Sequence, residues 1–150
     1  MNELFKKIDR KIADWMKRWS EPALRVSFGI IFIWFGILKP LGVSPAASLV
    51  KASVVWLPFG SPELWLNVIG WWEVVIGITF LFRGTTKIAI LLLFLQMVGT
   101  FMPLIVLPDI AFQNGNYLTP SIEGQYIIKN IMIISAALAL GGRYSKKNET

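Results

Sequence analysis

Long apolar runs separated by short polar or proline-containing segments dominate the chain. They predict four membrane-spanning helices, at residues 23–41, 64–82, 88–107 and 122–140, each close to the length of about 20 residues that crosses a bilayer core. The connections leave no room for a separate soluble domain. We therefore expect one membrane domain over residues 1–150, an all-α protein whose four transmembrane helices form an antiparallel bundle.

Residues 1–19 follow a different pattern, in which apolar and basic positions share a helical repeat. The apolar positions are Leu4, Phe5, Ile8, Ile12, Trp15, Met16 and Trp19, and the basic ones are Lys6, Lys7, Arg10, Lys11, Lys17 and Arg18. The pattern predicts an N-terminal amphipathic helix in the membrane interface, bound either to lipid alone or to a partner protein. Ser20 and Pro22 predict the boundary with the first span, as N-cap and first-turn residues.

The connections and helix ends carry local signals of their own. Residues 40–62 are unusually apolar for a loop and predict a helix too short to span, which we interpret as an interfacial or re-entrant segment after the first span. The other local signals are N-caps at Ser61 and Ser121, a kink at Pro103, a turn at Asn114 and Gly115, and a helix end at Gly141 and Gly142.

Composition supports this class and removes several chemistries. The chain is 55% hydrophobic and only 16% charged, whereas soluble domains carry about 25% charged residues. Cys and His are both absent, so this chain alone cannot form a disulfide, a thiol relay, a structural zinc site or a His-ligated haem. We expect no covalently bound cofactor and no catalysis by this chain on its own.

The net charge of +6 is distributed as in a membrane protein. Basic residues flank the apolar spans instead of lining an aromatic groove, which argues against nucleic acid as a partner. By the positive-inside rule, both termini, the turn at residues 83–87 and a polar tail at residues 143–150 are expected in the cytoplasm. Only Lys39, Lys51 and Lys129 fall on the outer half.

Glu73 lies near the middle of the second apolar run, where an acid costs about 2.5 to 3.5 kcal/mol on insertion scales and is expected to pair or to face protein. Lys129 is predicted at a similar depth, and Lys39 can reach inward from the end of the first span. We predict a polar intramembrane centre, a candidate ligand site, made of Glu73, Lys129 and Lys39. Its expected lining is Gln96, Asn130, Trp34, Trp71 and Trp72. The alternative is an ion pair that only fixes helix register.

Four glycines predict how the first two spans pack. Gly29 and Gly36 are seven residues apart, as are Gly70 and Gly77, so each pair shares one helix face. Small residues at this spacing allow close approach of two antiparallel helices, although a ligand against the bare backbone is an alternative. Arg25, at the start of the first span, is explained by snorkelling to the interface.

These residues also carry a resemblance to a known family. The motifs are Arg25-x-x-x-Gly29, Phe35-Gly36-Ile37-Leu38-Lys39, Glu73-x-x-x-Gly77 and Glu123-Gly124-Gln125-Tyr126-x-x-Lys129-Asn130. In order and spacing, over residues 23–142, the chain resembles the DoxX-like superfamily of small four-helix membrane proteins, most closely its YkgB-type branch. The resemblance implies a multi-pass protein of the bacterial inner membrane, linked to quinone-dependent oxidation or to oxidative-stress resistance. Some relatives use cysteines, which this chain lacks.

Two function classes follow. In the first, the chain is a non-catalytic or quinone-handling subunit of a membrane oxidoreductase or oxidative-stress system, with a quinone as ligand and other oxidoreductase subunits as partners. In the second, it is a small carrier or pore for an anionic or protonatable solute, gated by Glu73. The second class needs a homo-oligomer, because four helices are few for alternating access. The lipid bilayer is a partner in both.

Overall fold

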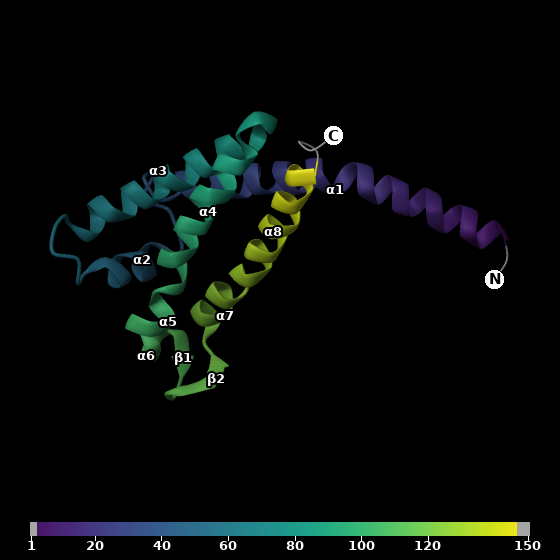
Figure 1. Ribbon diagram of the computed structural model, residues 1–150. Helices are drawn as coiled ribbons and strands as arrows, with labels where there is room; N and C mark the ends of the chain where they lie inside the picture. Colours follow the sequence, from purple (N-terminus) through teal and green to yellow (C-terminus); the bar gives the residue numbers. More distant parts are fainter. Residues whose placement is uncertain (1–2, 147–150) are drawn as a thin grey trace.

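The computed structural model describes residues 3–146 and is almost entirely helical there (Figure 1). Its elements are α1 (Glu3–Ile37), α2 (Ala47–Val54), α3 (Pro62–Leu81), the 3₁₀ turn η1 (Arg83–Thr85), α4 (Thr86–Phe101), α5 (Pro103–Val106), α6 (Pro108–Ala111), β1 (Phe112–Gln113), β2 (Asn116–Pro120), α7 (Ile122–Ile128) and α8 (Asn130–Lys146). Four segments are long and apolar enough to cross a membrane, at Glu3–Ile37, Pro62–Leu81, Arg83–Val106 and Ile122–Tyr144. The chain therefore has the build of a multi-pass membrane protein.

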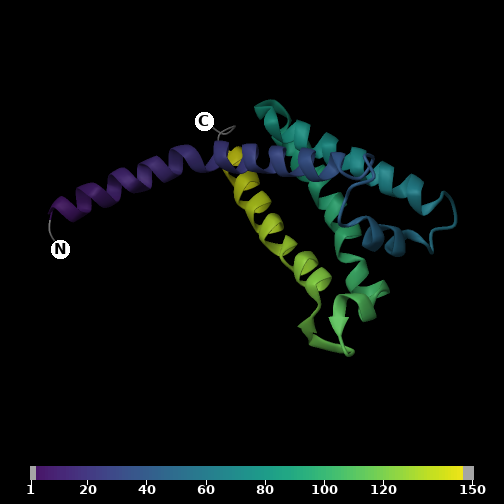
Figure 2. The same cartoon turned by 180° about the vertical axis from the view of Figure 1, so that it is seen from behind.

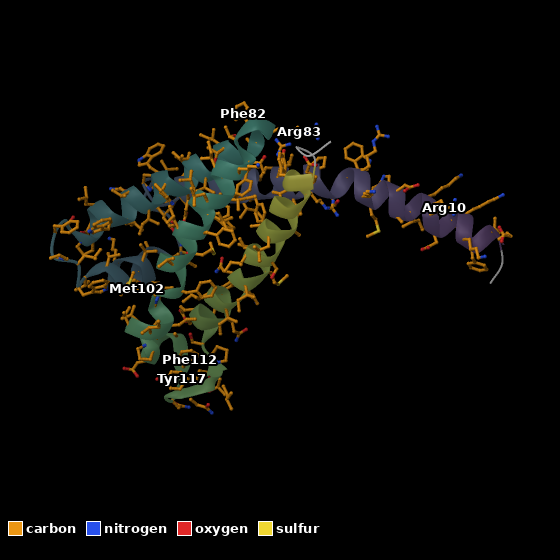
Figure 3. All side chains as sticks on the ribbon, viewed as in Figure 1. Arg10, Phe82, Arg83, Met102, Phe112 and Tyr117 are labelled. Carbon is orange, nitrogen blue, oxygen red and sulfur yellow. The ribbon has the colours of Figure 1, made fainter. Side chains whose placement is uncertain are left out.

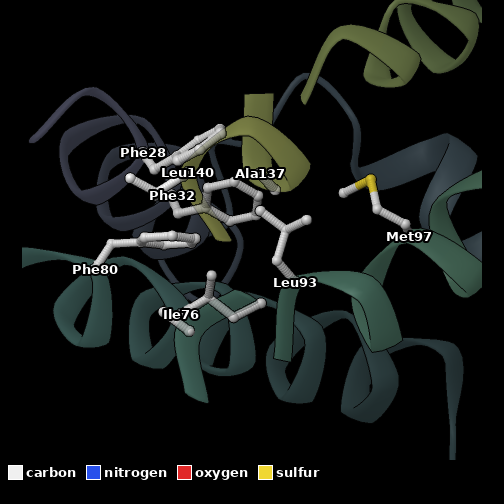
Figure 4. Close-up of a cluster of buried hydrophobic side chains, with 9 residues drawn as sticks. Phe28, Phe32, Ile76, Phe80, Leu93, Met97, Ala137 and Leu140 are labelled. Carbon is white, nitrogen blue, oxygen red and sulfur yellow. The ribbon is translucent and has the colours of Figure 1, made fainter. Parts of the chain in front are cut away.

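All four of these segments contribute to one hydrophobic core. Helices α1 and α3 run side by side, α4 and α7–α8 slant away from them, and the small β-hairpin lies at the far end (Figures 1 and 2). The core consists of Phe28, Phe32, Ile76, Phe80, Ala89, Leu93, Met97, Ala137 and Leu140 (Figure 4). Phe28 of α1 and Phe80 of α3 pack against each other in a tilted arrangement, with ring centroids 4.8 Å apart. This contact joins the first two spans within the core that they share with α4 and α8.

Much of the apolar surface points outward. In the most apolar stretch of each membrane-length segment, only 22 to 33% of the residues are buried within the protein. Val98, Ile105 and Met132 expose 74, 81 and 73% of their surface. An apolar surface of this extent would be costly in water and is compatible with a lipid environment.

Helix α1 is continuous through Pro22, so the predicted boundary at Ser20 and Pro22 is wrong. Proline removes one helical hydrogen bond, the one its missing N–H would make to the carbonyl of Arg18, and the turns on either side continue. Arg143 of α8 donates a hydrogen bond to the Ser20 hydroxyl, which holds α1 against α8 at this point. The amphipathic residues are thus the first half of a helix of 35 residues, about 52 Å long at 1.5 Å per residue. That half projects beyond the body (Figures 1 and 2).

The helix starts predicted at Ser61 and Ser121 are confirmed. Ser61 accepts a hydrogen bond from the backbone N–H of Leu64 at 3.1 Å, and Ser121 accepts one from Gly124 at 3.0 Å. The third span breaks between α4 and α5, where Pro103 begins a new turn. In contrast, α8 continues past Gly141 and Gly142 to Lys146, because neither glycine adopts the positive φ that ends a helix. Residues 147–150 of the predicted polar tail lie outside the described residues.

The two long connections both contain regular secondary structure. The predicted short helix after the first span is α2, and Lys51 on α2 pairs with Glu63 at the start of α3 at 3.1 Å. Its position in the interface or membrane stays a prediction. The second connection contains α6 and the β1–β2 hairpin, which the sequence did not predict because β1 has only two residues. The predicted turn is present, with Asn114 and Gly115 at φ of 52° and 69°.

Candidate functional site: an ion pair between three helices

Glu73 on α3 forms an ion pair with Lys39. Lys39 lies in the turn that follows α1, and its backbone N–H still bonds to the carbonyl of Gly36 at 3.2 Å, which keeps the turn compact. Both side chains are buried, with 7% of the Lys39 side chain and 13% of the Glu73 side chain exposed. The pair therefore neutralises two charges inside the apolar part of the molecule.

A third helix completes the site through Gln96 of α4. Its Nε2 donates a hydrogen bond to Oε1 of Glu73 at 3.0 Å, while Lys39 Nζ binds Oε2. Lys39 Nζ also donates to the carbonyl of Phe35 at 3.4 Å. Each carboxylate oxygen of Glu73 thus has a donor, as a buried carboxylate requires.

The site keeps hydrogen-bond donors that have no partner within residues 3–146. An ammonium group has three N–H bonds, and two of those on Lys39 have partners among the described residues. The amide of Gln96 has two N–H bonds and uses one. Chemically, the cluster is one proton acceptor, Glu73, beside two groups that can each donate one more hydrogen bond.

Lys129 does not join this centre, which corrects the sequence prediction. It lies between α7 and α8 with its Nζ 5.2 Å from the centre of the Tyr126 ring, and it is exposed. Asn130 is also elsewhere, because its side chain donates to the carbonyls of Tyr126 and Ile127 and so bridges the break between α7 and α8. Depth along a helix does not fix the direction in which a side chain points.

The predicted tryptophans divide into two kinds. Trp34 and Trp71 expose 61 and 54% of their surface and point outward, as lipid-facing residues do. Trp72 is half-buried and packs against the hydrophobic core. None of the three has a hydrogen bond to the ion pair among the described residues, so no hydrogen bond supports the lining role predicted for them.

The four glycines place the ion pair by bringing α1 and α3 together. A Cβ added to Gly36 would lie 2.8 Å from the carbonyl oxygen of Gly70, and one added to Gly77 would lie 2.8 Å from that of Gly29. These distances are shorter than real Cβ contacts, so the two backbones touch. Gly36 faces Gly70, and Gly29, seven residues earlier on α1, faces Gly77, seven residues later on the antiparallel α3. This register brings Lys39 next to Glu73.

Arg25 has a structural role that its position at the start of the first span does not predict, since that position indicates only snorkelling to the interface. It is buried, and its Nε and Nη2 donate to the carbonyls of Phe80 and Leu81 at 3.2 and 2.7 Å. These carbonyls belong to the last turn of α3, where no helical N–H is left to bond them. The sequence spacing is consistent with this burial, because Arg25 shares a helix face with Gly29 and Phe32, which are both buried.

Comparison of the chain with family models, with curated proteins and with solved structures found no match in any of the three. The site is therefore interpreted from its own chemistry.

Proposed function

We propose that the chain is a quinone-handling, non-catalytic subunit of a membrane oxidoreductase or oxidative-stress system, and that the resemblance to DoxX-like proteins reflects common descent. The observation that supports this is the buried Lys39–Glu73 pair with Gln96, which offers N–H donors without a partner among the described residues in apolar surroundings. Because the sequence has neither Cys nor His, we place the electron carrier of such a system in another subunit.

A quinone head group suits these donors. Its two carbonyl oxygens accept hydrogen bonds, and the free N–H groups of Lys39 and Gln96 are the donors that can meet one of them. Glu73 can exchange a proton next to that oxygen. The isoprenoid tail would lie along the apolar outer surface, as lipid chains do.

Retention of quinone during purification tests the proposal. We expect the protein purified in mild detergent to carry a quinone in its lipid extract. Gln96→Met should reduce the amount by about tenfold, the loss expected when a hydrogen bond worth about 1.5 kcal/mol is removed. Gln125→Met is the matched control, because Gln125 is exposed on α7. An extract without quinone, or equal retention by both variants, contradicts the proposal.

The carrier or pore remains the second candidate, and the geometry supports it less. A pore for an anion needs a cation that is free to meet it, and Lys39 is already neutralised by Glu73. Solute flux in liposomes that contain only this protein would favour the carrier over the quinone subunit.

We also propose that the protein lies in the bacterial inner membrane with both ends and the η1 turn in the cytoplasm. The chain has no cysteine, so a single introduced cysteine can show on which side of the membrane its position lies. Gly84 and Leu118 suit the test, because a Cβ on Gly84 meets no atom within 4 Å and Leu118 is 89% exposed. In intact cells, we expect an impermeant thiol reagent to label Leu118→Cys but not Gly84→Cys. The reverse pattern rejects this orientation.

A further inference from the structure

An open cavity lined by arginines lies at the C-terminal end of α3, away from Glu73 in the middle of that helix. Its volume is about 410 Å³, and its lining residues are Arg18, Trp19, Pro22, Arg25 and Arg83. It forms where the middle of α1 passes the end of α3, near the point where α8 also ends (Figure 3). The cavity is separate from the ion pair, because Arg25 contacts Phe80 and Leu81, seven and eight residues along α3 from Glu73.

Among residues 3–146, the charges around this cavity are not balanced. Three guanidinium groups line it, and Glu21 is the acid paired with them, with its Oε1 3.3 Å from Nη2 of Arg83. The partners of Arg25 are neutral backbone carbonyls, which leave its charge uncompensated. Arg143 adds a further cation nearby through its bond to Ser20. Positive charges gathered in a partly desolvated place repel one another, and a bound anion relieves that repulsion.

We propose that this cavity binds a phosphate group, supplied by an anionic phospholipid or by soluble phosphate. Guanidinium groups bind phosphate through paired hydrogen bonds, and Arg18 and Arg83 are the exposed arginines that can turn toward it. Arg25, which is buried, adds a positive charge to the wall of the cavity.

The surroundings favour a lipid as the source. The cavity lies at the end of a membrane-length helix, the level at which headgroups sit. Its volume is within the range of about 300 to 1,000 Å³ that is typical of small-molecule sites. This is more space than a bare phosphate ion occupies. Trp19 offers an apolar wall to the glycerol part of a lipid.

Native mass spectrometry of the full chain with added lipid tests this site. The probes are phosphatidylglycerol and diacylglycerol, which has no phosphate. We expect the wild type to retain phosphatidylglycerol selectively, and the double variant Arg18→Gln with Arg83→Gln to bind it about tenfold more weakly, from loss of charged hydrogen bonds. The control, Lys51→Gln with Lys129→Gln, removes the same charge from α2 and from the junction of α7 and α8, neither of which lines the cavity, and should bind normally.

Equal weakening in both double variants overturns the proposal, because net charge alone would then explain binding. No weakening in the arginine variant also overturns it. Inorganic phosphate that displaces the lipid and stabilises the lipid-free wild type, but not the arginine variant, identifies soluble phosphate as the source.

Should the arginine variant fail to fold, Glu21→Gln decides, since removal of the competing carboxylate should tighten lipid binding by about twofold. Unchanged or weaker binding by Glu21→Gln overturns the proposal.

Discussion

Replacement of Glu73 by Gln is expected to destabilise the protein by about 3 to 5 kcal/mol, because the buried ammonium of Lys39 loses its counter-ion. The double variant Glu73→Gln with Lys39→Met should recover much of that free energy, since both charges are then gone. Unfolding of the wild type, the two single variants and the double variant in detergent measures the coupling between the two side chains.

Lys129→Met provides the matched control for this cycle. Lys129 is exposed and lies away from Glu73, so its removal should add to the effect of Glu73→Gln within about 0.5 kcal/mol. A strong coupling of Glu73 to Lys129, together with none to Lys39, would contradict the site described above. That result would instead support a pair between Glu73 and Lys129, the pair that helix depth predicts.

The second large effect is expected at the glycines between α1 and α3. Gly36→Ala should cost about 1 to 3 kcal/mol, because the new methyl group would lie 2.8 Å from the carbonyl oxygen of Gly70 and would force the helices apart. Gly70→Ala should have a similar cost, since its methyl group would meet the carbonyl oxygen of Gly36. Thermal unfolding in the same detergent measures both.

Gly99→Ala is the control for helix propensity. Gly99 lies inside α4, and a Cβ there meets no other atom within 4 Å. The substitution should therefore stabilise the protein by up to about 1 kcal/mol, the usual difference between Gly and Ala in a helix. If all three alanine variants are stabilised, close backbone contact between α1 and α3 is not what these glycines provide.

The sequence predicts best where the cause of a feature is local. Ser61 and Ser121 were identifiable because an N-cap bonds to a backbone N–H three residues later in the same chain. The apolar runs likewise identify the four membrane-length helices, because length and hydropathy are properties of one segment. Glu73 stands out for the same reason, as the acid in the middle of an apolar run.

Features that depend on how helices rotate against each other were not predictable. Lys39 and Lys129 were both reasonable partners for Glu73 by depth, and only the register of α1 against α3 distinguishes them. The buried role of Arg25 depends on where the far end of α3 falls. Pro22 did not end α1, because the contacts of α1 with its neighbours outweigh one missing hydrogen bond.

The bonds from Arg25 to the last turn of α3 bear on how the chain enters the membrane during synthesis. Without α1, the α3 segment would reach the lipid with two carbonyls lacking donors and with the charge of Glu73 unpaired. Both deficits are met by residues made earlier in the chain, because Arg25 bonds the two carbonyls and Lys39 pairs with Glu73 in the middle of α3. A translocon that releases the first two spans together, as a preassembled hairpin, avoids exposing either deficit to lipid.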